Sequence, residues 1–203
     1  MKLYEHPFSS ACLKVRALIN ELGLPCELVT VDMQNGAHKA PEFLAMNPNG
    51  KIPTLDDGFY LWESNAIACY LAAKKPEAGL LPSDAHGMAQ VHQWLQWQAT
   101  TFAPSTHEVM METFYAKMFG REKDEAKYAA GLEKVKRDLG VLEKALAGKE
   151  YLCGALTVAD FSLSSYLLLR TMMGVDLEAF PNVKAWMGRM EARESVRKAL
   201  PPL

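Results

Sequence analysis

The chain has 203 residues, of which 49% are hydrophobic and 23% charged, so it can bury a substantial core and form one large domain or two small ones. Its formal net charge of −2 leaves no overall basic surface for the phosphates of nucleic acid, so nucleic-acid binding is not expected. No apolar run reaches the roughly 20 residues that span a bilayer, and the N-terminus lacks the basic and apolar regions of a signal peptide, so we expect a soluble cytoplasmic protein without membrane association.

The first third of the chain alternates short apolar segments with a helical one. Residues 2–5 (KLYE) are a candidate strand, and residues 11–22 carry apolar side chains at helical spacing that ends at Gly23. Residues 27–32 (ELVTVD) are rich in branched side chains, which favour a strand. Strand, helix and strand in this order predict a βαβ opening.

The next segment predicts a short helix, a β-hairpin and a third helix. A helical segment around residues 42–45 precedes NPNGKIPTLDDGFYLWES, in which the turn signals Asn-Pro, Asn-Gly and Asp-Asp-Gly flank two strand-like runs. These two strands should pair antiparallel. Ser64 then caps a helix, SNAIACYLAAKK, which stops before Pro76.

Composition and pattern change near residues 74–84 (KKPEAGLLPSD), which supply prolines, a glycine and charges typical of a linker. The remaining segments all have helical patterns. They cover residues 86–119 with an interruption at Pro104, then 121–146, 157–171 and 182–192. The sequence therefore predicts an α/β domain with βαβ-ββα order over residues 1–76, a linker over 77–85 and an all-helical domain over 86–203.

The cysteines and histidines are scattered along the chain. None of the four cysteines pairs with another at the spacing of metal ligands, and the five histidines are equally dispersed. We therefore predict no metal site and expect reduced thiols that act as small buried hydrophobes.

Four motifs, in this order, resemble those of the cytosolic glutathione transferases, with phi-class and theta-like features. They are HPFSSACLKV, GAHKAPEFLAMNPNGKIPTL, LWESNAI and LTVADFSL. The resemblance covers essentially the whole chain. It implies a thioredoxin-like N-terminal domain that binds glutathione as co-substrate, an all-helical C-terminal domain that carries a wall for the hydrophobic substrate, and a homodimer.

The resemblance implies that Ser9 stabilises the glutathione thiolate. A free thiol has a pKa near 8.5 and is mostly unreactive at neutral pH, whereas a hydroxyl donor at a helix N-terminus favours the anion. Alignment on the family's segment places Ser9 at the activating position and leaves Ser10 at the helix start, where a role as N-cap is sufficient. The choice between Ser9 and Ser10 remains open at this stage. Cys12, one turn into the helix, is expected to pack inward.

Two further segments are implied to bind glutathione. Ile52 precedes Pro53 at a bond that is cis in the family, and the Ile52 backbone should pair with the cysteinyl part of the ligand like an added strand. Ser64 and the helix N-terminus behind it should receive the γ-glutamyl carboxylate, and Glu63 should pair with the ammonium group.

The loop cations are implied to reach the glycyl carboxylate of glutathione. His38 and Lys39 match the phi-like loop, and Lys51 stands where the family often has glutamine. A cation suits a carboxylate, although loop charges are commonly only solvated.

The segment LTVADFSL resembles the family's buried capping box. Thr157 can cap the N–H of Asp160 while the Asp160 carboxylate accepts from the Thr157 N–H. We predict a structural role for this segment.

Met110, Met111, Phe114 and Met118 recur at three- and four-residue spacing, which predicts one shared helix face. Methionine adapts to varied hydrophobic ligands because it is flexible and polarizable, so these side chains are candidates for the substrate wall. Ordinary core packing is an equal alternative.

The leading interpretation is an enzyme that conjugates glutathione to hydrophobic electrophiles, with Ser9 stabilising the thiolate. A second is glutathione-dependent disulfide or peroxide chemistry through Cys12. A third is a non-catalytic protein that binds glutathione or hydrophobic ligands.

Overall fold

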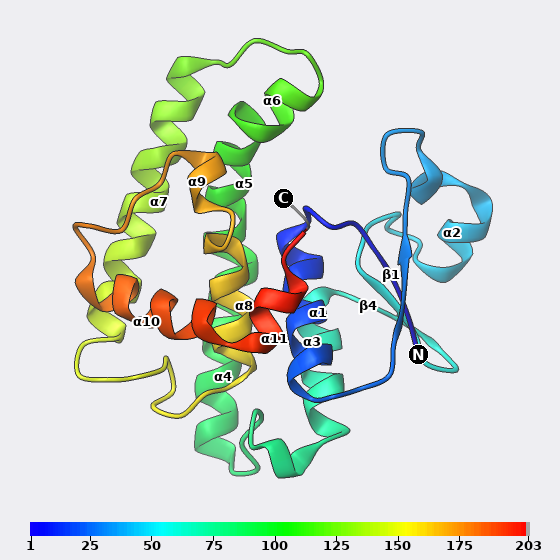
Figure 1. Ribbon diagram of the computed structural model, residues 1–203, viewed down its shortest axis with the longest axis horizontal. Coiled ribbons are helices and arrows are strands. Elements are labelled where there is room, and N and C mark those ends of the chain that lie inside the picture. The colour runs from blue at the N-terminus through cyan, green and yellow to red at the C-terminus, as the bar shows by residue number, and fades with distance from the viewer. Residues whose placement is uncertain (202–203) are drawn as a thin grey trace. The chain divides into compact units, whose positions relative to one another are not determined.

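The structure, a computed structural model, describes residues 1–201, which form two compact units (Figure 1). The first unit contains residues 1–81 together with the C-terminal segment from Glu191, and the second contains Pro82–Met190. The first combines a four-stranded sheet with helices, whereas helices build the second. The predicted fold class is therefore confirmed.

A mixed sheet organises the first unit. Its strands lie in the order β2-β1-β3-β4, with β2 parallel to β1 and β3 antiparallel to both of its neighbours. The strands are β1 (Lys2–Glu5), β2 (Glu27–Thr30), β3 (Thr54–Asp56) and β4 (Tyr60–Trp62). The predicted βαβ opening and hairpin are confirmed, although β2 ends at Thr30, before the end of the predicted strand.

Helices cover both faces of this sheet. The helical elements of the first unit are α1 (Ser10–Glu21), α2 (Pro41–Met46), α3 (Ser64–Ala73), α11 (Glu194–Ala199) and the 3-10 turns η1 (Ala37–Lys39) and η2 (Pro76–Ala78). Helices α1 and α3 lie on one face and α2 on the other (Figure 1), where Tyr4 meets Phe43 edge to face. Apolar side chains without solvent exposure, including Leu3, Leu13 and Leu55, form the core.

The last helix, α11, belongs with the first unit, where it packs on α1. Arg16 of α1 donates to the Ala199 carbonyl from Nε at 3.0 Å and from Nη2 at 2.7 Å. Asn20 Nδ2 donates to the Ser195 carbonyl at 3.0 Å. The compact units thus differ from the predicted domains at the C-terminal end, because α1 supplies donors to the carbonyls of this segment.

The second unit is a helical bundle. Its helices are α4 (Ala85–Trp97), α5 (Ala103–Glu112), α6 (Phe114–Met118), α7 (Glu125–Ala145), α8 (Val158–Leu167), α9 (Arg170–Met173) and α10 (Pro181–Ala192), of which the last two residues are assigned to the first unit. Within residues 1–201, no helix combines the length and apolar character needed to cross a membrane.

The predicted helix over residues 86–119 is divided differently from the expectation. A π-helical turn, Gln98–Phe102, joins α4 to α5, and Pro104 lies in the first turn of α5, where its missing N–H costs little. The expected interruption at Pro104 is therefore wrong. The break comes at Thr113, whose φ of −116° and ψ of −86° separate α5 from α6.

The capping box at the start of α8 is confirmed. The Asp160 carboxylate accepts from the Thr157 N–H at 2.9 Å, and Thr157 Oγ1 accepts from the Ala159 N–H at 3.3 Å. Asp160 also accepts from the Leu152 N–H and from Trp186 Nε1, each at 3.0 Å. Because Asp160 is fully buried, these donors satisfy a carboxylate that would otherwise be costly in the core.

Candidate functional site

The register of the sheet brings three loops of the first unit to the same end of the strands. Tyr4 of β1 lies opposite Thr54 of β3, which lies opposite Trp62 of β4. The chain leaves β1 and β4 at this end of the sheet and enters β3 there, because β3 runs antiparallel to both. The segments that carry Ser9, Ile52 and Glu63 therefore meet at the same end of the sheet.

Ser9 is the N-cap of α1. Its backbone is extended, with φ −83° and ψ 118°, and its Oγ accepts from the Cys12 N–H at 3.4 Å. Ser10 is the first helical residue, so the expectation that Ser10 caps the helix is wrong. Since Ser9 Oγ is an acceptor in this bond, its own hydrogen can be donated to a second group at the helix N-terminus.

Cys12 points into the core, as expected. It has no solvent exposure, and burial raises the pKa of its thiol to about 12. Cys12 is therefore a neutral thiol at physiological pH. Because the thiolate is the reactive species in disulfide exchange, this environment argues against chemistry through Cys12.

The Ile52-Pro53 peptide bond is cis, as expected. Within residues 1–201, the backbone N–H and C=O of Ile52 make no hydrogen bond. One donor and one acceptor are therefore open to a ligand at this end of the sheet. Asn47, which the sequence indicated only as a turn residue, is buried and holds this segment. Its Nδ2 donates to the Lys51 carbonyl at 2.8 Å and to Thr54 Oγ1 at 3.1 Å.

The loop around η1 packs on the turn that precedes Ile52. Lys39 Nζ donates to the Gly50 carbonyl at 3.3 Å. A Cβ at Gly50 would lie 2.8 Å from the His38 carbonyl oxygen, and Gly50 has a positive φ of 58°, so only glycine fits without a shift. The structure thus brings His38 and Lys39 to the turn beside Lys51, whose side chain is exposed.

Glu63 lies at the junction between β4 and α3 with an unusual backbone. Its φ is 68° and its ψ 109°, and it is the one non-glycine residue with positive φ in residues 1–201. Such a conformation costs about 1–3 kcal/mol and is concentrated at functional sites. Glu63, and not Ser64, is the N-cap of α3, so the expectation that Ser64 caps this helix is wrong.

Ser64 is the first residue of α3, and its side chain contacts a residue that the sequence reasoning missed. Lys14 of α1 is fully buried, and its Nζ donates to Ser64 Oγ at 3.0 Å and to Asn65 Oδ1 at 2.5 Å. Burial lowers the pKa of Lys14 to about 7. The signal in the sequence was a lysine flanked by Leu13 and Val15 within an apolar helix.

The residues predicted to form the substrate wall lie on two helices. Met110 and Met111 belong to α5, whereas Phe114 and Met118 belong to α6. The break between these helices makes the expected single helix face wrong. Met110 is buried, Met111 and Phe114 are half-buried, and Met118 is exposed.

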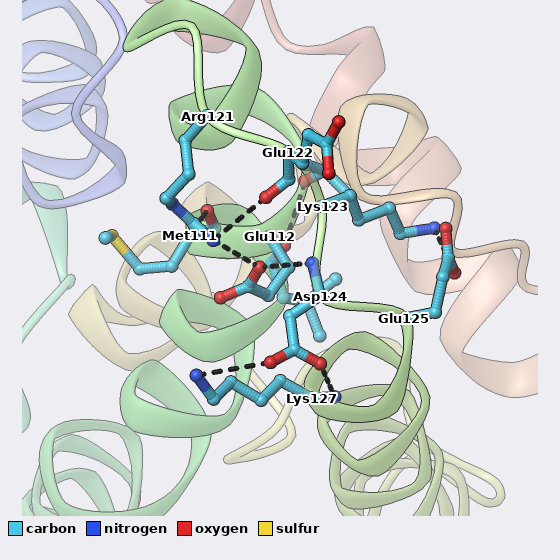
Figure 2. A network of polar contacts seen from close by, with 10 residues as sticks. Met111, Glu112, Arg121, Glu122, Lys123, Asp124, Glu125 and Lys127 are labelled. Atoms are coloured by element: carbon cyan, nitrogen blue, oxygen red, sulfur yellow. Dashed lines mark hydrogen bonds and ion pairs between the residues drawn. The ribbon is translucent and has the colours of Figure 1, made fainter.

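A buried carboxylate holds the chain that returns after α6 (Figure 2). Glu112 Oε2 accepts from Arg121 Nη1 at 2.9 Å and from the Asp124 N–H at 3.0 Å. Arg121 Nη2 donates to the Met111 carbonyl at 2.6 Å. This network fixes the end of α5 from which the Met111 side chain projects.

Comparison with known proteins assigns the chain to a family. The models for the N-terminal and C-terminal domains of glutathione S-transferase match residues 1–73 and 102–194. A probable glutathione S-transferase from Oryza sativa subsp. japonica is 36% identical in an alignment that covers 98% of this chain and 94% of that protein. The solved structure of glutathione S-transferase-I bound with lactoylglutathione has a TM-score of 0.89 and 34% identity. The superposition covers 98% of this chain and 97% of that chain. A glutathione S-transferase from Pseudomonas fluorescens has a TM-score of 0.88 and 34% identity, covering 96% of each chain. The chain therefore belongs to the glutathione S-transferase family of enzymes.

Proposed function

We propose that this enzyme binds glutathione at the strand ends of its first unit, where the loops with Ser9, Ile52 and Glu63 meet. It joins glutathione through its sulfur to hydrophobic electrophiles, and Ser9 stabilises the thiolate. The observation that carries the proposal is the position of Ser9 as N-cap of α1. A hydroxyl there adds a hydrogen-bond donor to the positive end of the helix dipole. Lowering a thiol pKa by two units requires about 2.7 kcal/mol of preferential thiolate stabilisation.

The reaction needs no nucleophile from the protein itself. The bound thiol loses its proton, and a sulfur electron pair forms a bond to an electrophilic carbon. In a substitution the leaving group departs with its bonding electrons, and in an addition a proton joins the product. Ser9 stays unmodified, because it donates a hydrogen bond to the sulfur anion and does not form a bond to carbon.

The loops at this end of the sheet offer complementary groups for each part of the tripeptide. The open backbone of Ile52 beside Pro53 suits the cysteinyl part, as in strand addition. The N-terminus of α3 suits the γ-glutamyl carboxylate, with the exposed Glu63 available to the ammonium group. The proposed glutathione ligands are His38, Lys39, Lys51, Ile52, Pro53, Glu63 and Ser64.

The second unit is proposed to supply the wall for the electrophile. Met111, Phe114 and Met118 keep exposed surface that an apolar ligand can cover, whereas Met110 is buried. Methionine side chains accommodate ligands of varied shape, so a broad class of hydrophobic electrophiles fits this wall better than a single compound.

A homodimer is also proposed, supported by exposed aromatic side chains on the β3-β4 hairpin. Phe59 and Tyr60 are each 48% exposed and Trp62 is 37% exposed. Since β4 is an edge strand, this hairpin presents apolar surface where a second chain can cover it.

The test is a titration of the bound glutathione thiol in the wild type, Ser9→Ala and Ser10→Ala, paired with turnover of an electrophilic aryl halide. We expect Ser9→Ala to raise the pKa of bound glutathione and to reduce turnover about 100-fold, the effect of removing one anion-stabilising donor. Ser10→Ala should behave as the wild type. If Ser10→Ala lost activity and Ser9→Ala did not, the assignment of Ser9 would be wrong.

Two further outcomes would favour the competing functions. Activity toward mixed disulfides that Cys12→Ser abolishes would support thiol chemistry at Cys12, against its buried environment. Retention on immobilised glutathione without conjugation of any electrophile in a panel would support a binding protein.

A further inference from the structure

Lys14 is a buried cation that the proposed transfer reaction does not use. Its side chain has no solvent exposure and extends from α1 to the first turn of α3. A buried ammonium is costly unless its N–H groups are hydrogen-bonded. Lys14 donates to Ser64 Oγ at 3.0 Å and to Asn65 Oδ1 at 2.5 Å, so these two acceptors of α3 offset part of the cost of burying the charge.

The direction of these two hydrogen bonds fixes the orientation of their acceptors. An ammonium group can only donate, so Ser64 Oγ accepts from Lys14 and its own hydrogen must point away from Nζ. The Asn65 oxygen likewise faces Lys14, which turns its amide nitrogen elsewhere. Lys14 therefore sets Ser64 as a donor at the N-terminus of α3, where backbone N–H groups also favour an anion.

We propose that Lys14 is a positioning residue that aims the Ser64 hydroxyl at the α-carboxylate of the γ-glutamyl group and strengthens that hydrogen bond with its charge. The inference rests on the proposed role of Ser64 in binding glutathione. Lys14 acts through Ser64 and does not itself touch the ligand. Hydrogen bonds to charged groups contribute more than neutral ones, so the effect should appear as affinity for ligands that carry this carboxylate.

The proposal also links glutathione binding to protonation of Lys14. Burial lowers the pKa of Lys14 to about 7, and the titratable groups that act on it are Cys12, Glu63 and Cys69. Burial raises the pKa of Cys12 and of Cys69, so both stay neutral thiols. A carboxylate bound at Ser64 favours the ammonium form of Lys14. Binding near neutral pH should therefore take up a fraction of a proton, and affinity should fall as the pH rises above about 7.

The experiment compares Lys14→Met, which removes the charge, with Lys14→Arg, which keeps it. Calorimetry measures the affinity of S-methylglutathione, which has no ionisable thiol, and of an analogue without the α-carboxylate. Lys14→Met should weaken S-methylglutathione on the order of tenfold and leave the analogue unchanged. Lys14→Arg should retain affinity. In turnover, Lys14→Met should raise KM for glutathione with little change in kcat.

The Lys14→Arg variant also tests the protonation step, because arginine is not deprotonated in proteins. In the wild type, heats measured in buffers of different ionisation enthalpy should reveal proton uptake on binding S-methylglutathione. Lys14→Arg should show less uptake and a flatter dependence of affinity on pH. This arm needs only folded proteins that keep the charge, so it decides the question even if Lys14→Met fails to fold.

Ser64→Ala separates the failure of this inference from failure of the proposed function. If the wild type does not bind S-methylglutathione, or if Ser64→Ala binds it normally, the proposed function of Ser64 is wrong and this inference falls with it. If Ser64→Ala weakens binding but Lys14→Met does not, only the role of Lys14 is overturned. Equal weakening of both ligands by Lys14→Met, or no proton uptake in the wild type, would also overturn it.

Discussion

Arg16 shows how one buried side chain can join distant segments of the first unit. Its guanidinium forms an ion pair with Glu5 of β1 and donates to the Pro7 carbonyl at 2.7 Å and to the Ala199 carbonyl of α11. Both members of the pair are nearly inaccessible to solvent. Pro7 lies in the loop that leads to Ser9, so Arg16 also supports the segment that carries the proposed thiolate donor.

Replacing Arg16 with leucine should destabilise the protein by about 3–5 kcal/mol, because it leaves the Glu5 carboxylate buried without its counterion. Chemical denaturation monitored by circular dichroism measures the loss. The control is Lys2→Ala, which breaks an exposed pair with Glu27 and should cost less than about 1 kcal/mol. Equal losses in the two variants would contradict a special role for the buried pair.

Lys14 and Arg16 also show what the sequence leaves undecided at the residue scale. The run ACLKVRALI predicts a helix, which the structure confirms as part of α1. The apolar neighbours of Lys14 hint at its burial, but a cation in such a run is ordinarily solvated, and its partners cannot be read from the sequence. The partners come from other helices. Ser64 of α3 accepts from Lys14, and the Ala199 carbonyl of α11 accepts from Arg16.

At the scale of elements, α1 and α11 are fastened by a second set of polar contacts. Arg193, at the start of α11, pairs with Glu21 at the end of α1, and Ser195 Oγ donates to the same carboxylate. Burial acts to raise the pKa of Glu21, but the hydrogen bonds from Arg193 and Ser195 bring it below its ordinary value. Proton binding to Glu21 therefore competes with the contact between these helices.

Arg193→Met should lower the free energy of unfolding by about 1 kcal/mol at neutral pH, since the pair is only partly exposed and extends between two helices. A carboxylate with a depressed folded-state pKa stabilises the fold above its unfolded pKa, and this contribution is lost as the pH falls through the folded value. The difference between wild type and variant should therefore shrink below about pH 4. Denaturation curves at neutral and acid pH measure it, and a difference that grew in acid would contradict this account.

The break between α5 and α6 is an element boundary that local pattern could not reveal. Residues 110–118 contain no proline or glycine, and their apolar spacing continues through Thr113. The return of the chain to Glu112 through Arg121 and Asp124 holds α6 in its own direction (Figure 2). These bonds join residues that lie 9 and 12 positions apart, beyond the reach of one helical turn, and they override helix propensity, which is only a weak preference.

At the scale of the whole molecule, the proposed homodimer depends on apolar surface that the fold leaves uncovered in a single chain. Phe59 remains 48% exposed although its ring packs edge to face on Tyr70 with 5.4 Å between centroids. Such exposed aromatic side chains on an edge hairpin are a liability in a monomer, and association with a second chain would bury them.

Phe59→Asp should shift the protein from dimer to monomer in sedimentation equilibrium, because it places a charge on the surface that a second chain would cover. The matched control is Phe119→Asp, which changes a phenylalanine of the second unit that is 63% exposed. This control should leave the dimer intact. A wild type that sediments with the mass of one chain would refute the homodimer, and dissociation by Phe119→Asp alone would refute the assignment of the hairpin.

Features that depend on neighbouring residues could be predicted from the amino-acid sequence. The four strands and helices α1, α2 and α3 of the first unit, the Asn-Pro and Asn-Gly turn before Ile52 and the capping box at Thr157 follow from propensity, turn chemistry and side-chain reach over a few positions. Helix α11 was not predicted. The motifs also identified the family, which the comparisons confirmed.

The contacts between distant segments, in contrast, depend on the packing of the whole chain. The packing of the chain places Lys14 against Ser64 and brings α11, at the far end of the sequence, onto α1. The physical reason is that burial and hydrogen bonds between distant segments depend on how the whole chain packs, and these terms outweigh local preference where the two differ.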